Sequence, residues 1–171
     1  MTTTTSRDLE LRAIVDATAA AVADAPDKAA ALFRATGDSG DGVRTDLRIG
    51  RHQVTIDEPP ALGGQDAAIN PVESALAALV SCQVVTYRFW AAKLGIPVDD
   101  VHVETEGDLD VRGFFGLDDA VRPGFGEVRL LVTLTGPAPA EDYARLKDAV
   151  DAHCPVLDLF RNPTPVASRL A

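Results

Sequence analysis

The longest apolar pattern in the chain predicts one helix, from Ile69 to Gly95. Apolar and small side chains recur there at spacings of three and four residues, which is the period of one helix face. That face holds Val72, Ala75, Leu76, Leu79, Cys82, Thr86 and Trp90. We therefore expect Cys82 to point inward, together with the core.

Both ends of this helix carry the residues that helix ends favour. Asn70 can accept hydrogen bonds from first-turn N–H groups, Pro71 suits the first helical position, and Glu73 stands at the third. At the other end Gly95 can take the left-handed conformation that stops a helix. The helix boundaries are thus predicted within a residue or two.

Two further stretches show helical periodicity. The first begins at Ser6 and stops before Pro26, and its apolar stripe predicts a packing helix. The second runs from residue 137 to His153, is followed by Cys154 and Pro155, and leads into a further helical turn over 156–160. Because proline disfavours the α conformation in the residue before it, we expect Cys154 at a helix boundary. The predicted inward side chains are Leu11, Ile14, Val15, Thr18, Ala19 and Val22 in the first stretch, and Tyr143, Leu146, Ala149 and Val150 in the second.

Alternating or β-branched segments predict the strands. They cover residues 29–36, 43–49, 52–56, 98–111, 128–134 and 164–170. The segments rich in glycine, aspartate or proline predict a turn over 36–42 and loops over 57–69 and 112–125, the last of them mobile. The order of these elements indicates an α+β fold with helices against a mainly antiparallel sheet.

Composition limits the classes of function. The 171 residues, 46% of them hydrophobic, suffice for one compact domain, which we place at 29–171 behind an N-terminal tail and packing helix over 1–28. A net charge of −10 opposes binding to nucleic acid or to an anionic membrane surface. No apolar run approaches a membrane span and the N-terminus lacks a signal pattern, so we expect a cytoplasmic protein whose two cysteines are free or redox-active.

The cysteines carry the candidate chemistry. An ordinary thiol with a pKa near 8.5 is mostly protonated at pH 7, and burial raises the pKa further, so a reactive Cys82 needs a cation close by. The alternative is that Cys82 is a small buried hydrophobe and Cys154 a helix-end residue. The candidate cations are Arg34, Arg44, Arg48, Arg51 and Arg88.

Other site chemistries have less support. The only adjacent pair of metal-ligand types is His153 with Cys154, and no Cys-x-x-Cys spacing is present, so we expect no metal and no cofactor. His153 suits a helix-end residue better than a general base, and Glu73 suits a helix cap better than a catalytic acid. No Gly-x-Ser-x-Gly elbow marks a serine hydrolase.

Several motifs in a fixed order resemble the OsmC/Ohr superfamily over about residues 30 to 170. They are HQVTIDEP (52–59), GGQD (63–66), NPVESALAALVSC (70–82), GDLDVRGFFG (107–116), PGFGEV (123–128) and HCPV (153–156). The resemblance implies an intertwined homodimer of α+β fold, with mainly antiparallel sheets packed on a long central helix that bears the first cysteine. The register of Glu73, one residue later than in the best-characterised peroxidases, points to a divergent branch.

The resemblance also implies roles for residues. Cys82 would be the peroxidatic and Cys154 the resolving cysteine of an organic hydroperoxide reductase active in oxidative stress, with a dithiol, such as a lipoyl group, as reductant. Arg44 or Arg51 would activate the Cys82 thiol. Glu73 is the weakest of the candidate catalytic residues. The alternative is a non-catalytic homodimer of the same fold that binds a small apolar ligand. Candidates for an apolar pocket wall are Leu79, Phe89, Trp90, Phe114 and Phe115.

Overall fold

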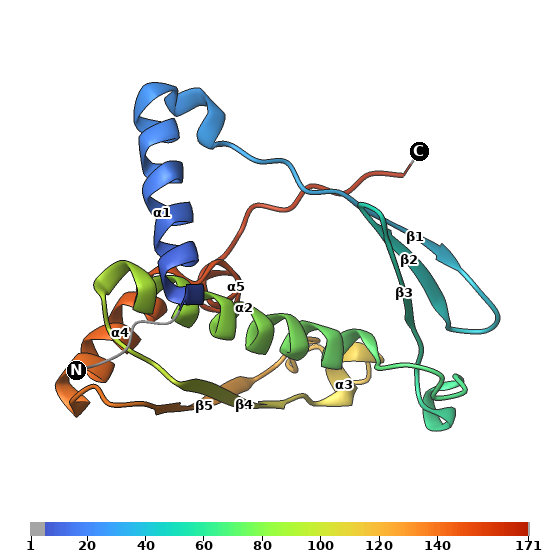
Figure 1. Ribbon diagram of the computed structural model, residues 1–171. Coiled ribbons are helices and arrows are strands. Elements are labelled where there is room, and N and C mark those ends of the chain that lie inside the picture. The colour runs from blue at the N-terminus through green and yellow to red at the C-terminus, as the bar shows by residue number, and fades with distance from the viewer. Residues whose placement is uncertain (1–5, 171) are drawn as a thin grey trace. The chain divides into compact units, whose positions relative to one another are not determined.

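The computed structural model describes residues 6–170, which divide into two compact units (Figure 1). One unit contains residues 6–17 and 78–170, and the other contains residues 18–77. Two helices run from one unit into the other: α1 (Ser6–Asp24) and α2 (Pro71–Leu94). Each unit has its own antiparallel sheet.

The ends of α2 confirm the predicted caps. The Asn70 side chain accepts a hydrogen bond from the Glu73 N–H at 2.8 Å, and the Glu73 carboxylate accepts one from the Asn70 N–H at 2.9 Å, which is a complete capping box. At the other end Gly95 has a φ of +69°, and the N–H groups of Gly95 and Ile96 bond to the carbonyls of Ala92 and Ala91. This is the Schellman arrangement that ends a helix.

The buried face of α2 differs in part from the predicted one. Leu79 and Thr86 are buried as expected, and Cys82 is half-buried beside the core. Gln83 and Tyr87, however, are also buried, so the covered stripe is turned toward them. By hydropathy alone, a valine on α2 would be buried in preference to a glutamine. The side of α2 that is buried depends instead on where the neighbouring strands and α4 lie.

By length and composition alone, α2 is apolar enough to cross a membrane, contrary to the expectation that no segment approaches a span. A core helix meets the same test. The buried polar side chains of Gln83 and Thr86 fit a helix that packs within protein.

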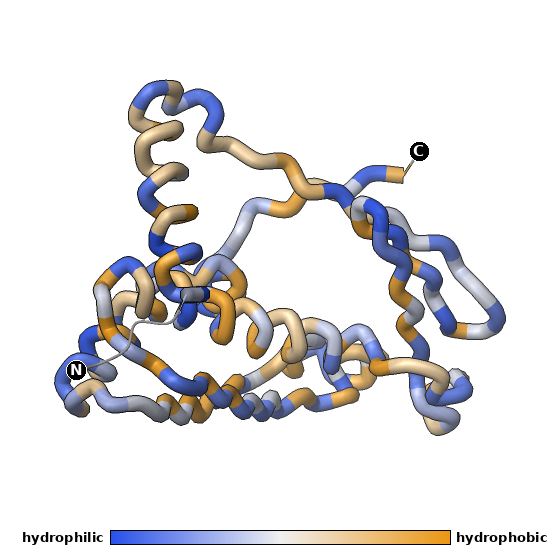
Figure 2. Tube along the Cα trace, in the orientation of Figure 1, coloured by the Kyte–Doolittle hydropathy of each residue, from blue (hydrophilic) through white to orange (hydrophobic). Residues whose placement is uncertain are grey.

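The unit of residues 6–17 and 78–170 encloses the apolar core. Strands β4 (Asp100–Asp108) and β5 (Glu127–Thr135) pair antiparallel, with Val103 opposite Val132. The hydropathy of the residues alternates along both strands (Figure 2). One face of this two-stranded sheet packs against α2 and α4 (Ala140–His153). Leu146 and Val150 of α4 are fully buried there, which confirms the predicted inward face of that helix. The short helices α3 (Val111–Phe114) and α5 (Pro155–Arg161) complete the unit.

The unit of residues 18–77 has a three-stranded sheet and very little core. Strands β1 (Ala35–Ser39), β2 (Thr45–Ile49) and β3 (His52–Ile56) pair in sequence order, and the short helices η1 (Pro26–Ala29) and η2 (Pro60–Leu62) flank them. Of these residues, all of which the structure describes, Ile56 and Asp57 are the two that are buried. The sheet is thus organised mainly by its hairpins.

A buried carboxylate organises the loop that leads to α2. Asp57 accepts hydrogen bonds from the N–H groups of Glu58, Gln65 and Ala67 at 2.9 to 3.1 Å. These bonds hold the pKa of Asp57 below its ordinary value. Gly64 lies so close to the Glu58 carbonyl that a side chain there would collide with it. The loop predicted over 57–69 is therefore irregular but firmly held.

The positions of the predicted helices are confirmed, but no residue of α1 is buried: Leu11, Val15 and Val22 of its predicted stripe are half-buried, whereas the others, Ile14, Thr18 and Ala19, are exposed.

Several strand, turn and loop predictions need correction. The strand predicted over 98–111 covers only Asp100–Asp108. The first strand begins at Ala35 rather than at residue 29 and ends at Ser39, because pairing with β2 sets its register. The turn predicted over 36–42 therefore lies over 40–44, where the Gly40 N–H donates a 2.8 Å hydrogen bond to the Arg44 carbonyl. Residues 164–170 form no strand, since prolines at 163 and 165 lack the N–H that a ladder needs. The segment after β4 starts with α3, capped by Asp110.

Candidate functional site

The two thiols come together in the unit that holds the core. Cys82 lies in the middle of α2 and Cys154 at the junction of α4 with α5, and both are free thiols. The Cys154 side chain lies near enough to the Cys82 thiol to affect its pKa, and both residues pack in the same core. Cys154 is 1% exposed, whereas Cys82 is half-buried. A small molecule that enters from solvent therefore meets Cys82 first.

The backbone around Cys154 explains its position. Pro155 follows it, and Cys154 adopts the extended conformation with φ −79° and ψ 112°. Its N–H still bonds to the Val150 carbonyl at 2.9 Å, and its carbonyl accepts from the Asp158 N–H at 3.0 Å. Cys154 thus ends one helix and begins the next, as the sequence predicts.

The surroundings of Cys82 favour the neutral thiol. Burial raises the pKa of Cys82 above its ordinary value, and the adjacent Cys154 thiol raises it further. The Val156 backbone N–H and the Thr86 hydroxyl lower it, but by less; the hydroxyl oxygen lies 4.0 Å from the sulfur. Within residues 6–17 and 78–170 no cationic side chain contributes to this balance. Within this unit, burial is therefore the largest influence on Cys82, and it favours the neutral thiol.

Arg88, one of the candidate cations, is held elsewhere. Its guanidinium donates to the carbonyls of Val98 and Asp99 at 2.9 and 3.1 Å and pairs with Asp100 at 3.7 Å. Arg88 therefore ties α2 to the start of β4.

The other predicted site residues, Arg44, Arg51 and Glu73, belong to the unit of residues 18–77. Arg44 pairs with Asp46 at 2.9 Å. Arg51 is exposed in the turn between β2 and β3, and Glu73 is engaged in the α2 capping box. Their catalytic roles remain predictions.

Two buried polar side chains of α2 were not anticipated. Gln83 and Tyr87 are buried on α2, and neither the Gln83 Nε2 nor the Tyr87 hydroxyl has a hydrogen-bond partner among residues 6–170. Burial raises the pKa of Tyr87 to about 12, and the charges of Asp151, Asp148 and Cys154 add to the shift. The only signal in the sequence is a glutamine and a tyrosine within an apolar helical run.

A cavity of about 420 Å³ lies in the same unit, and neither cysteine lines it. Its wall includes Leu79, one helical turn before Cys82, and Leu157, three residues after Cys154. The other side chains that line it are Arg122, Phe125, Glu127, Val128, Leu130, Leu159, Phe160 and Arg161. The cavity is thus lined by both apolar and charged side chains.

Of the aromatic residues predicted for a pocket wall, none lines this cavity. Trp90 stacks on His153 with ring centroids 4.3 Å apart, and Phe114 contacts Phe115 at 4.9 Å in an exposed position. Phe89 is half-buried on α2. Leu79 is thus the one predicted wall residue that the cavity contains.

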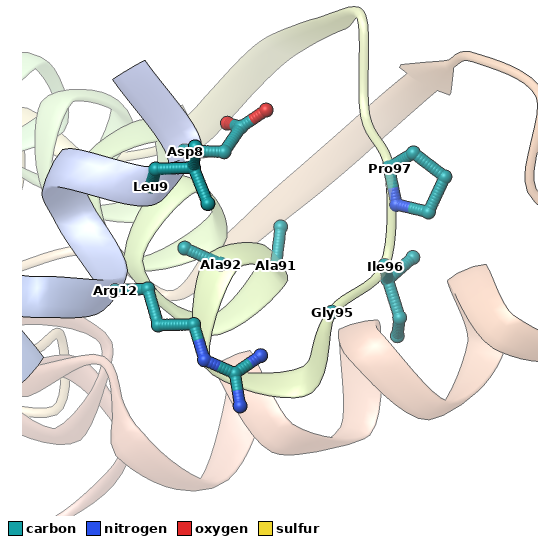
Figure 3. A pocket seen from close by; sticks show the side chains of 8 residues that line it. All are labelled: Asp8, Leu9, Arg12, Ala91, Ala92, Gly95, Ile96 and Pro97. Atoms are coloured by element: carbon teal, nitrogen blue, oxygen red, sulfur yellow. The ribbon is translucent and has the colours of Figure 1, made fainter. Parts of the chain in front are cut away.

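A second cavity, of about 230 Å³, lies where α1 meets the C-terminal end of α2 (Figure 3). Leu9 and Arg12 of α1 face Ala91, Ala92 and the chain around Gly95 there. Neither cysteine lines it, so this cavity is separate from the thiol pair.

Leu11, Val15 and Val22 of α1 are half-buried, whereas Ile14 is exposed.

A metal centre has no support in the described part of the chain. Across residues 6–170, no three histidine, cysteine, aspartate or glutamate side chains gather closely enough to hold an ion. His153 hydrogen-bonds through Nδ1 to the Ala149 carbonyl at 2.8 Å, as a residue at the end of a helix does. His153 therefore caps α4.

Solved structures with the same fold come from several bacteria. An OsmC-like protein from Mycoplasma pneumoniae is 16% identical with a TM-score of 0.64, and the match covers 77% of this chain and 88% of that one. An organic hydroperoxide resistance protein OsmC from Legionella pneumophila is 23% identical with a TM-score of 0.59, covering 77% and 90%. One from Elizabethkingia anophelis, with thiocyanate bound, is 20% identical with a TM-score of 0.60, covering 77% and 89%.

At these identities the structural matches establish the fold alone. No curated protein sequence gives a significant match. The model of the family described as OsmC-like protein matches residues 63–169, which is more than half of the chain and includes both cysteines. The chain therefore belongs to the OsmC-like protein family.

Proposed function

We propose that this protein is a thiol-dependent organic hydroperoxide reductase, with Cys82 as the peroxidatic and Cys154 as the resolving cysteine. The observation that carries the proposal is the proximity of a half-buried thiol on α2 to a buried thiol at the α4–α5 junction. The Legionella pneumophila and Elizabethkingia anophelis relatives are named as organic hydroperoxide resistance proteins, which supports the same chemistry.

The reaction follows ordinary thiol chemistry. The Cys82 thiolate attacks the distal oxygen of the hydroperoxide, the O–O bond breaks, and the alcohol leaves after taking a proton. Cys82 becomes a sulfenic acid, and Cys154 displaces its hydroxyl as water to form a disulfide. A dithiol such as a lipoyl group then reduces the disulfide by exchange. The apolar side chains of the cavity that Leu79 and Leu157 help to line suit the organic part of the substrate.

The raised pKa of Cys82 requires an activating cation. We assign that role to Arg44 or Arg51. Glu73 is a weak candidate for the residue that orients the arginine. The arginine comes from residues 18–77 of the same chain or of a partner subunit in a homodimer. The sparsely buried sheet β1–β3 supports a dimer, because an antiparallel sheet normally covers at least one face.

A second function is favoured by the same two features. A thiol with a raised pKa, in a unit that has a cavity of about 420 Å³ with apolar side chains in its wall, also suits a non-catalytic dimer that binds a small apolar ligand. In that case the cysteines stay reduced.

Peroxide consumption distinguishes the two functions. The purified protein should consume cumene hydroperoxide with dihydrolipoamide as reductant, and Cys82→Ser should lower the rate by at least about 100-fold, because the nucleophile is lost. Cys154→Ser should leave a sulfenic acid on Cys82 that a dimedone-type reagent traps. Consumption that is unchanged in Cys82→Ser, or absent in the wild type, would favour the ligand-binding function.

The activating arginine is tested with a matched control. Arg44→Ala or Arg51→Ala should raise the pKa of Cys82 measured from its alkylation rate, since an opposite charge stabilises a thiolate. Arg145→Ala removes an exposed arginine of α4 that pairs with Asp142 and is not among the candidate cations, and it should leave that pKa unchanged. An equal shift in all three variants would indicate a general loss of positive charge.

A further inference from the structure

The lining of the cavity of about 420 Å³ changes in character from its buried to its exposed residues. The buried residues of its wall are Leu79 and Leu157, and both are apolar. Its charged residues, Arg122, Glu127 and Arg161, are all exposed. The volume is within the range of sites that hold small molecules. The cavity therefore offers apolar contact on its buried side and charge on the side of solvent.

Two phenylalanines and a glycine hold part of this wall in place. The rings of Phe125 and Phe160, which both line the cavity, have their centroids 6.3 Å apart. The Phe125 ring lies so close to Gly107 of β4 that any side chain at position 107 would collide with it. The fold thus provides this wall in advance of any ligand.

Arg122 is the cation of this cavity that the fold leaves unpaired. Across residues 6–170, its guanidinium makes no hydrogen bond and no ion pair. The other charged residues of the lining do have partners: Glu127 pairs with Arg129 at 2.9 Å, and Arg161 pairs with Asp151 at 3.3 Å. The chain has 26 acidic and only 16 basic residues, so carboxylates that could pair with Arg122 are plentiful. Its charge is therefore available to a ligand.

The position of the Arg122 guanidinium follows from a second glycine. A β-carbon on Gly124, which also lines the cavity, would lie 3.5 Å from Nη2 of Arg122. The guanidinium thus lies over the wall of the cavity. Arg122 also borders a neighbouring cavity of about 510 Å³, where Asp108 and Asp110 are each paired with another arginine. Neither aspartate therefore neutralises Arg122.

We propose that this cavity binds a medium-chain carboxylate, whose hydrocarbon chain contacts Leu79, Leu130 and Leu157 and whose carboxylate accepts hydrogen bonds from Arg122. A guanidinium fits a carboxylate through two parallel N–H donors. The inference rests on the proposed function in assigning the cavity to the organic part of a substrate or ligand, and it adds the chemical class of that molecule. It concerns binding alone and involves no reaction at the thiols.

A comparison of two molecules on the wild-type protein tests the inference without any variant. Octanoate and 1-octanol have the same chain length, but only octanoate carries a charge at neutral pH. In calorimetric titrations octanoate should bind about tenfold more tightly, as expected for a hydrogen-bonded charge pair. Added salt should weaken octanoate binding and leave 1-octanol binding unchanged. Hexanoate should bind about tenfold more weakly than octanoate, because two buried CH₂ groups are lost.

A pair of arginine variants identifies the residue that binds the carboxylate. Arg122→Met keeps most of the side-chain volume and should weaken octanoate binding by about tenfold while leaving 1-octanol binding unchanged. Arg145→Met is the matched control, since it removes an exposed arginine of α4 that does not line the cavity. It should leave the binding of both molecules unchanged.

An added carboxylate tests the cavity from its opposite side. Leu159 lines the cavity and is 58% exposed, so that Leu159→Glu introduces a negative charge without disturbing the core. This variant should weaken octanoate binding more than 1-octanol binding, because like charges repel.

Each outcome decides the question. Equal affinity of the wild type for octanoate and 1-octanol would overturn the inference, and so would equal weakening in Arg122→Met and Arg145→Met or an absence of octanoate binding. The titrations use no peroxide. Charge-selective binding by a protein that consumes no hydroperoxide would therefore retain the inference and reject the reductase function. Hydroperoxide consumption without octanoate binding would do the reverse.

Discussion

The two units of this protein are stabilised in different ways. Residues 78–170 enclose a core in which Leu79, Tyr87, Leu146 and Val150 are fully buried. Residues 18–77 form a three-stranded sheet in which Ile56 and Asp57 are the buried residues. The first unit is held by apolar burial, and the second by hairpin geometry and by the hydrogen bonds around Asp57.

The division matters for function. Both thiols lie in the unit with the core, where burial places them near each other but raises the pKa of Cys82. The candidate cations Arg44 and Arg51 lie in the other unit. The proposed reaction therefore needs, besides the two thiols of the first unit, a cation that this unit does not bring to Cys82.

The largest contrast is expected from truncation of apolar side chains. Leu146→Ala removes a fully buried side chain and should lower the free energy of unfolding by about 3 kcal/mol. Val54→Ala on β3, at 40% exposure, should lower it by less than about 1 kcal/mol. Urea denaturation measures both. A large effect of Val54→Ala would show that the sheet is covered in the assembled protein, and would support the dimer.

Backbone crowding should be the next largest effect, and it tests the loop of the second unit. Gly64→Ala places a methyl group against the Glu58 carbonyl and should lower the free energy of unfolding by about 2 kcal/mol. Gly40→Ala meets only the flexible Arg44 side chain and should change it by at most about 0.5 kcal/mol. If the two variants were equally stable, the loop around Asp57 would be softer than its hydrogen bonds indicate.

A pH series tests Asp57 itself. Its pKa is lowered in the fold, so its contribution is present above the unfolded pKa of about 3.9 and is lost as the pH falls through the folded pKa. Asp57→Asn should lower the Tm by roughly 5 °C at pH 7, and the difference should shrink below about pH 4. Thermal melts from pH 3 to 7 measure this. A difference independent of pH would mean that the carboxylate charge is unimportant.

The smallest expected effect separates two tyrosines of the first unit. Tyr143→Phe breaks hydrogen bonds to Ala138 and Pro97 and should lower the free energy of unfolding by about 1 kcal/mol. Tyr87→Phe removes an unpaired hydroxyl and should change it by no more than about 0.5 kcal/mol in either direction. A larger loss in Tyr87→Phe would mean that its hydroxyl is paired in solution.

Local sequence rules predicted the elements best where both ends carry chemical signals. Asn70, Glu73 and Gly95 bound α2 as expected, and strand β3 has its predicted limits of His52 and Ile56. The first strand was misplaced because its register follows from pairing with β2, which a single segment does not encode. The last predicted strand failed because its neighbouring prolines outweigh its apolar residues.

The candidate site was only partly predictable. The sequence identified both cysteines and placed Cys154 at a helix boundary, since Pro155 restricts the backbone locally. It left Arg88 among the candidate cations, whereas in the fold Arg88 binds the carbonyls at the start of β4. It did not predict the burial of Gln83 and Tyr87, because glutamine and tyrosine in a helix are ordinarily at least partly exposed.

The sequence by itself thus determined the helix caps, the position of Cys154 between two helices, the alternation of the strands and the family resemblance. These features depend on residues close together in the chain. Tertiary structure alone decided that Cys82 lies near Cys154, that the covered face of α2 includes Gln83 and Tyr87, and that Cys82 lacks a cation within its own unit. Those features depend on how distant segments pack, and helical periodicity predicts a stripe without predicting what covers it.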